Sequence, residues 1–154
     1  MGAAKQAKHA VLPFIVADIF QLAGEFRARG EAVAKMVGQT QARWQVLSAA
    51  SGEPRTVPQI ARRLGVTRQG VQRLADLLAR DGLARFETNP DHKTSPYLVL
   101  TTKGRATLAQ LSDAAARAHR LTADRLDDSE VQNLHRGVRR LLAALNSRPM
   151  EDQP

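Results

Sequence analysis

The chain contains no cysteine. This absence excludes a disulfide scaffold, a thiol redox switch and a cysteine-based zinc site. It also fits a cytoplasmic protein, which is the location we expect. No uninterrupted apolar run approaches the roughly 20 residues that a membrane-spanning helix needs, so we expect no membrane partner.

The signatures of catalysis are also missing. The six serines occur without a nucleophile-elbow pattern, and no glycine-rich phosphate loop is present. Asp127 and Asp128 are adjacent, but they lie at an expected helix start, where acidic caps are common. We therefore expect no enzyme, no cofactor and no metal site, because the histidines also lack paired-ligand spacing: they are His9, His92, His119 and His135.

The positive charge of the chain is concentrated in its middle third. The 154 residues carry a net charge of +8, and 43% of them are hydrophobic, which is typical of a soluble globular protein. Residues 55–105 contain ten Lys/Arg against four Asp/Glu, whereas residues 106–154 contain seven of each. Because a basic surface attracts phosphates and releases their counterions, the middle third is the expected nucleic-acid-binding part.

Residues 56–81 have the pattern of two short helices joined by a glycine turn. Thr56 and Gln59 have the spacing of a capping box, and Gly65 can adopt the left-handed conformation that ends a helix. Thr67 is the expected cap of the second helix, and Gly82 stops it. The expected buried positions are Val57, Ile60, Ala61 and Leu64 in the first helix, and Val71, Leu74, Leu77 and Leu78 in the second.

This arrangement predicts a helix-turn-helix whose second helix enters the major groove of DNA. Arginine can read guanine, glutamine can read adenine, and the threonine methyl group can touch thymine. The alternative is an ordinary helical hairpin with a solvated polar face. The predicted DNA contacts on this helix are Thr67, Arg68, Gln69, Gln72 and Arg73.

A β-hairpin is expected after the second helix. Leu83–Phe86 and Tyr97–Leu100 are strand candidates, and the Asn-Pro-Asp sequence at residues 89–91 is a strong turn signal. A hairpin in this position is a wing, which can lie beside the phosphate backbone; the alternative is a hairpin that only covers the core. The predicted contacts at its tip are Asp91, His92, Lys93 and Thr94.

Helical patterns flank this region on both sides. We expect helices over residues 13–37, with Pro13 in the first turn, and over 40–50, with Thr40 as cap; residues 51–55 are an expected loop. Another helix is expected from Thr101 or Thr102 to Thr122. A last helix, capped by Asp127 with Glu130, carries an apolar seam at Val131, Leu134, Val138, Leu141 and Leu145. This seam suits packing against a second subunit, although an internal core helix has the same pattern.

The order of these elements resembles the multiple-antibiotic-resistance regulator (MarR) family of bacterial winged-helix transcription factors. The resemblance is carried by the sequences VPQIA at 57–61, VTRQGV at 66–71, LLARDGL at 77–83, NPDHK at 89–93 and LTTKGR at 100–105. It implies a mostly α fold with a small two-stranded β-wing. It also implies three parts: an N-terminal dimerisation helix (1–38), the winged helix-turn-helix lobe (39–104) and C-terminal dimerisation helices (105–154).

The resemblance further implies a homodimer that binds double-stranded DNA at a near-palindromic operator and acts as a repressor. Family members often release DNA when a small aromatic compound binds, and the candidate lining here is Phe20, Arg43 and Trp44. In the family an acidic wing residue orients a basic one; the matching residues are Asp91 with His92 or Lys93, where arginine is usual. The alternative function is an architectural or protein-binding winged-helix module without a ligand response.

Overall fold

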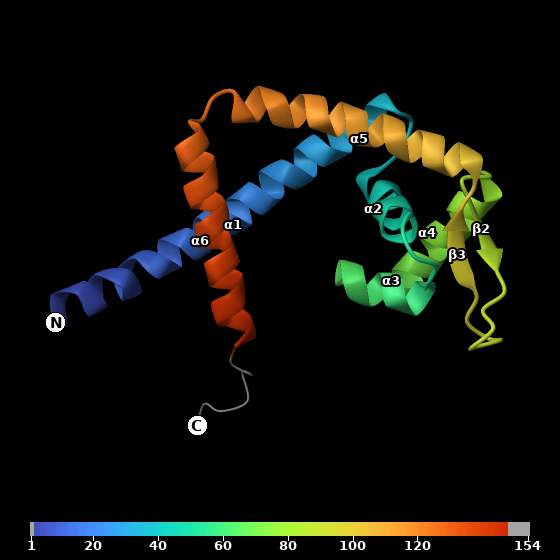
Figure 1. Cartoon of the computed structure of the whole chain (residues 1–154), viewed down its shortest axis with the longest axis horizontal. Helices are drawn as coiled ribbons and strands as arrows, with labels where there is room; N and C mark the ends of the chain where they lie inside the picture. Colours follow the sequence, from blue (N-terminus) through green and yellow to red (C-terminus); the bar gives the residue numbers. More distant parts are fainter. Residues whose placement is uncertain (1, 148–154) are drawn as a thin grey trace. The chain divides into compact units, whose positions relative to one another are not determined.

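A computed structural model describes residues 2–147 of the chain (Figure 1). The chain forms two compact units that divide after Ala115, within α5, and each unit is described by itself. The elements are α1 (Gly2–Met36), α2 (Gln41–Ala50), β1 (Arg55–Thr56), α3 (Val57–Leu64), α4 (Arg68–Arg80), β2 (Ala84–Glu87), β3 (Tyr97–Leu100), α5 (Thr102–Ala123) and α6 (Asp128–Asn146).

The core of the first unit lies where α2, α3 and α4 meet one face of a small sheet (Figure 1). Ala34 brings the end of α1 into this core, and Leu111 brings in α5. Burial of each large apolar side chain contributes on the order of 1.5–3 kcal/mol, so this cluster is the main source of stability in the lobe. Its fully buried large side chains are Val46, Leu47, Ile60, Val71, Leu78, Leu98 and Leu111.

The sheet has three antiparallel strands in the order β1-β3-β2, whereas the sequence predicted a two-stranded wing and a loop over residues 51–55. β2 and β3 pair from Ala84 opposite Leu100 to Glu87 opposite Tyr97. The third strand pairs Arg55 with Leu98 and Thr56 with Tyr97. A strand of two residues is too short to show a periodic pattern in the sequence. It forms because it pairs with β3, which is distant in sequence but adjacent in the fold.

The predicted helix ends are largely confirmed. The Thr40 hydroxyl accepts a hydrogen bond from the Arg43 N–H, and Thr56 with Gln59 forms the expected capping box. Gly65 adopts the left-handed conformation, with φ of 66°. Three expected core positions were wrong in degree: Leu64, Leu74 and Leu77 are only partly buried, whereas Ala75, which was not expected in the core, is fully buried.

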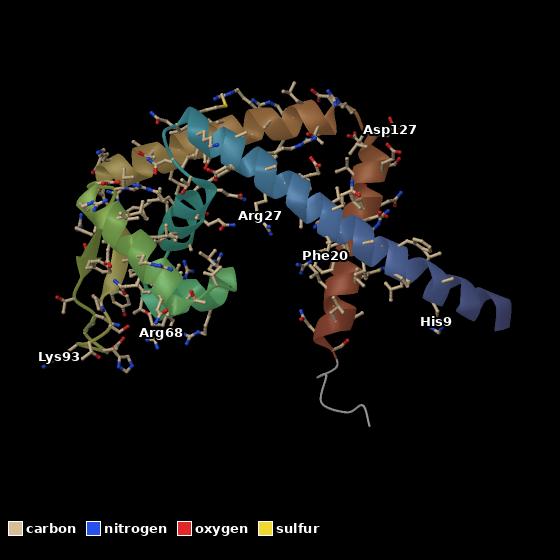
Figure 2. The ribbon with its side chains drawn as sticks, turned by 180° about the vertical axis from the view of Figure 1, so that it is seen from behind. His9, Phe20, Arg27, Arg68, Lys93 and Asp127 are labelled. Atoms are coloured by element: carbon tan, nitrogen blue, oxygen red, sulfur yellow. The ribbon has the colours of Figure 1, made fainter. Side chains whose placement is uncertain are left out.

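Helix α1 is longer than the sequence indicated. It begins at Gly2 rather than near Pro13, which therefore lies inside the helix. Proline removes one helical hydrogen bond, but this did not end the helix. Over residues 9–36, where the structure describes burial, Val33 and Ala34 are the buried residues of α1, whereas many apolar side chains earlier in the helix are exposed; Phe20 is 75% exposed (Figure 2).

The segment His9–Met36 of α1 is long and apolar enough, by length and composition only, to cross a membrane. This is weak evidence, because core helices of soluble proteins and signal sequences meet the same criterion. The expectation from the sequence rested on an uninterrupted apolar run, and Asp18 breaks the run in this helix. A criterion based on the mean hydropathy of a helical window still admits a segment that contains such a charge.

The second unit contains the end of α5 and all of α6. Helix α6 has the predicted start, with Asp127 and Glu130 forming a capping box. Its apolar seam is exposed in this chain at Val131, Leu134, Val138 and Leu145, whereas Leu141 is partly buried; the adjacent Leu142 is also exposed. The seam and the exposed apolar side chains of α1 are apolar surfaces that the single chain leaves uncovered.

Gly104 permits a close contact between the start of α5 and the start of β2. A Cβ atom on this residue would lie 1.8 Å from the Leu83 carbonyl oxygen, so Gly104→Ala should shift the backbone and lower the free energy of unfolding by about 1–3 kcal/mol. Urea denaturation measures the change. Gly24→Ala is the control, because that position in α1 has no atom within 4 Å of the new methyl group and alanine favours the helix. Equal losses in both variants would contradict the close-contact account.

Candidate nucleic-acid interface

The apolar side of α4 determines which of its residues face outward. Val71, Ala75 and Leu78 are buried in the core, spaced three and four residues apart. The Thr67 hydroxyl accepts a hydrogen bond from the Gly70 N–H at 3.2 Å and so caps the start of the helix. The opposite side is therefore exposed and polar; its residues are Arg68, Gln69, Gln72, Arg73, Asp76 and Arg80.

The wing tip is held by the buried side chain of Asn89. Its Nδ2 donates a hydrogen bond to the Ser95 carbonyl at 3.0 Å, and its Oδ1 accepts one from the Asp91 N–H at 3.0 Å. These bonds close the loop and leave His92, Lys93 and Thr94 exposed. The predicted tip residues are thus brought together at the surface. However, among the residues that the structure describes, no ion pair joins Asp91 to His92 or Lys93.

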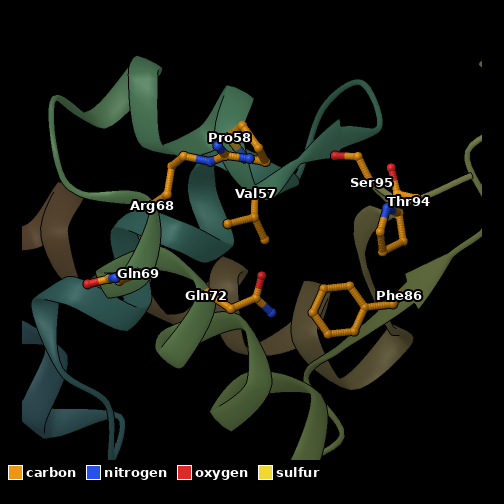
Figure 3. A pocket seen from close by; sticks show the side chains of 9 residues that line it. Val57, Pro58, Arg68, Gln69, Gln72, Phe86, Thr94 and Ser95 are labelled. Carbon is orange, nitrogen blue, oxygen red and sulfur yellow. The ribbon is translucent and has the colours of Figure 1, made fainter. Parts of the chain in front are cut away.

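An open hollow of about 600 Å³ lies between α4 and the wing (Figure 3). It brings Arg68 and Gln72 of α4 together with Thr94 of the wing, although these residues are far apart in the sequence. Sequence reasoning missed the rest of its lining, because those side chains carry no DNA-reading signal of their own and meet only in the folded lobe. The lining residues not predicted are Val57, Pro58, Phe86 and Pro96.

Exposed cations lie on α3, α4 and the wing. Arg68 lines the hollow, and Arg62 and Arg63 are exposed in the last turn of α3, close in sequence to Arg68 at the start of α4. Figure 2 shows Arg68 and Lys93 toward one end of the lobe. A polyanion bound across α4 and the wing would meet the positive charge of both residues, which is the electrostatic requirement for binding a phosphate backbone.

The far end of α4 is fixed by a polar junction. The Arg43 Nη2 of α2 donates a hydrogen bond to the Asp81 Oδ2 at 2.7 Å, and the Lys103 ammonium donates to the Asp81 carbonyl at 3.0 Å. The Thr101 hydroxyl donates to the Gly82 carbonyl at 2.7 Å. The hydrogen bond from Arg43 is the main reason that the pKa of the Asp81 carboxyl is lowered from its usual value, with the charges of Arg43, Arg80 and Lys103 acting in the same direction.

Among the hollows that the structure describes, none is lined by all three candidate effector residues. Phe20 is exposed on α1, and Arg43 is engaged with Asp81. Trp44 packs against the core and lines a hollow of about 270 Å³ with Arg63. An effector site built from these residues stays a prediction.

Comparison with known proteins adds independent evidence on the fold and family. The chain is 50% identical over 133 residues to the uncharacterized proteins Mb2034c of Mycobacterium bovis and Rv2011c of Mycobacterium tuberculosis, covering 86% of this chain and 93% of theirs. The family model described as the MarR family matches residues 38–93. The chain belongs to the MarR family.

Solved structures of MarR-family and other transcriptional regulators have the same fold. The transcriptional regulator PA3341 is 27% identical, with a TM-score of 0.76 over 87% of this chain and 99% of that one. The MarR family transcription regulator SP03579 is 23% identical, with a TM-score of 0.81 over 95% and 99%. CouR from Rhodococcus jostii RHA1, solved bound to p-coumaroyl-CoA, is 17% identical, with a TM-score of 0.71 over 82% and 90%. This MarR-family chain is therefore a winged-helix transcription regulator, and the mostly α fold class predicted from its sequence is confirmed.

The Asp81–Arg43 pair should make stability depend on pH. Because the pKa of Asp81 is lower in the folded state, the pair stabilises the fold above the unfolded pKa of about 3.8, and this contribution disappears as the pH falls through the folded value. Asp81→Asn should therefore lower the urea midpoint at pH 7, and its deficit relative to the wild type should shrink below about pH 4.

The control for this measurement is Glu53→Gln, because the side chain of Glu53 is 90% exposed. It should leave the midpoint nearly unchanged at both pH values. A deficit of Asp81→Asn that stayed constant from pH 7 to pH 3 would show that the charge on Asp81 contributes nothing.

Proposed function

We propose that this MarR-family regulator acts as a homodimeric, sequence-specific repressor that binds a near-palindromic operator. The observation that carries the proposal is the outward polar face of α4, held beside the wing tip by the buried apolar face of the same helix. Arginine and glutamine on that face are suited to base edges, and Lys93 on the wing is suited to a phosphate. The predicted contacts remain Thr67, Arg68, Gln69, Gln72, Arg73, Asp91, His92, Lys93 and Thr94.

The exposed apolar surfaces support a dimer. Val131, Leu134 and Val138 form an exposed seam on α6, and α1 exposes a further series of apolar side chains that includes Phe14 and Phe20. Contiguous apolar surface of this kind marks an interaction site in a soluble protein. A two-fold dimer would present two copies of α4 to one side of DNA, about 34 Å apart, which requires a near-palindromic site.

The response to a small aromatic effector is the least supported part of the proposal. Its support is the family and CouR, which was solved with p-coumaroyl-CoA. Within one chain the hollow beside Trp44 is smaller than the about 300–1,000 Å³ of typical ligand pockets. An effector site at Trp44 would therefore require surfaces from a second copy, so it depends on the dimer.

Substitutions on α4 and on the wing should have different effects on DNA binding. Arg73→Ala or Gln69→Ala should cost about 1–3 kcal/mol on a selected duplex and change the base preference, because these side chains would read bases. Lys93→Ala should weaken selected and scrambled duplexes alike and reduce the salt slope by about one. Fluorescence titration over a range of salt concentrations measures both effects.

Lys35→Ala is the matched lysine control, because Lys35 is exposed in the last turn of α1, outside the proposed interface. It should leave affinity and salt slope nearly unchanged. Wild-type protein that bound selected and scrambled duplexes equally would overturn sequence-specific reading and would favour an architectural role.

The dimer is tested by a charge placed on the α6 seam. Leu134→Glu should weaken self-association about a hundred-fold or more, because two leucines lose burial worth about 1.5–3 kcal/mol each and two charges enter an apolar interface. Sedimentation equilibrium measures the change. Gln132→Glu, on the polar side of the same helix, should leave the dimer intact. A wild-type protein that was monomeric at micromolar concentration would rule the dimer out.

A further inference from the structure

One hydrogen bond joins two exposed side chains on the outward face of α4. The Gln72 Nε2 donates to the Asp76 Oδ1 at 2.8 Å, one helical turn away. Gln72 lines the hollow between α4 and the wing, where Figure 3 shows its side chain between Val57 and Phe86. Asp76 lines a separate, smaller hollow together with Arg73, Leu77 and Arg80. The pair thus lies on the proposed reading surface and connects two hollows of that surface.

The choice of partner is informative. Asp76 lies three residues after Arg73 and four before Arg80, which are both favourable spacings for an ion pair on a helix. Among the described residues, however, its hydrogen-bond partner is the amide of Gln72, and it forms an ion pair with neither arginine. Arg80 pairs instead with Asp81 at 3.9 Å, so Arg73 is the arginine beside Asp76 that remains available to DNA, and the carboxylate acts on the glutamine.

The Asp76 carboxylate determines which side of the Gln72 amide faces it. Ionised aspartate only accepts hydrogen bonds, so it selects the NH₂ side of the Gln72 amide and excludes the carbonyl side. A free glutamine side chain can rotate and present its donor and acceptor in either order. Bound to Asp76, the amide keeps one order, with one N–H engaged and the second N–H free beside Oε1.

We propose that Asp76 is a positioning residue that fixes the Gln72 amide for reading an adenine in the major groove. The free N–H would donate to adenine N7, and Oε1 would accept from the adenine N6 amino group. This inference rests on the proposed function, because it requires α4 to lie in the groove. It deepens that function by naming the base that Gln72 reads and the residue that sets its orientation.

Two substitutions of Asp76 test the role of the carboxylate. Asp76→Glu keeps the negative charge and a group that only accepts hydrogen bonds, still four residues from Gln72, whereas Asp76→Ala removes both. Loss of a negative charge raises the affinity for every duplex, so the measured quantity is selectivity: the ratio of affinities for the selected duplex and for the same duplex with adenine replaced by 7-deazaadenine, which lacks the N7 acceptor.

Fluorescence titration at fixed salt should show a selectivity loss of about three- to ten-fold in Asp76→Ala, the range expected for one hydrogen bond. Asp76→Glu should stay within about two-fold of the wild type, because its carboxylate still selects the NH₂ side of the Gln72 amide. Gln72→Ala should abolish the effect of 7-deazaadenine at one position of the half-site, and Asp76→Ala should then have no further effect. In a Gln69→Ala background, used as the matched control, Asp76→Ala should keep its full effect.

The outcomes distinguish this inference from the proposed function. Wild-type protein that did not discriminate between selected and scrambled duplexes would overturn the proposed function itself. A selective wild type with an equally selective Asp76→Ala variant would overturn only the role of Asp76. Equal losses in Asp76→Glu and Asp76→Ala would also overturn it, because a carboxylate that can still accept from Gln72 should keep the orientation of the amide.

Discussion

The burial of Val71, Ala75 and Leu78 is the constraint on which the rest of the interface depends. A helix has a period of 3.6 residues, so fixing these three side chains in the core fixes the rotation of α4 about its axis. Arg68, Gln69 and the polar residues after them then have only one direction available, toward solvent. No separate interaction is needed to present them, and the same apolar contacts stabilise the lobe and orient its reading face.

Rotation alone does not place the helix, and its two ends are held by different means. At the start, the Thr67 cap and the left-handed Gly65 set the turn from α3. At the end, Arg43 and Lys103 hold the residue Asp81, and Gly104 allows the start of α5 to lie directly against Leu83. Helix α5 continues from this contact into the second unit.

The exposed apolar surfaces of α1 and α6 are the surfaces that the proposed dimer would cover. A single chain of this kind covers its DNA-binding lobe well but leaves Phe20 and the seam around Leu134 in contact with solvent. The hydrophobic effect makes such surfaces costly, and the proposed dimer would cover both of them at once. The same composition allows α1 to meet a length-and-composition criterion for membrane helices.

Local sequence patterns were sufficient to predict the helix-turn-helix, the wing strands, most helix caps and the resemblance to the family. These features depend on local spacing and on turn residues such as Gly65 and Asn89. It also indicated which residues of α4 would be exposed, since periodicity carries that information. Features that depend on residues distant in sequence could be seen only in the folded chain. They are the strand Arg55–Thr56, the hollow that brings Phe86 and Ser95 near Gln72, and the pairing of Arg43 with Asp81. The folded chain also shows that Asp76 accepts its hydrogen bond from Gln72 and does not pair with Arg73 or Arg80. Helical spacing permits all three pairings, and only the positions of the side chains in the folded lobe select one.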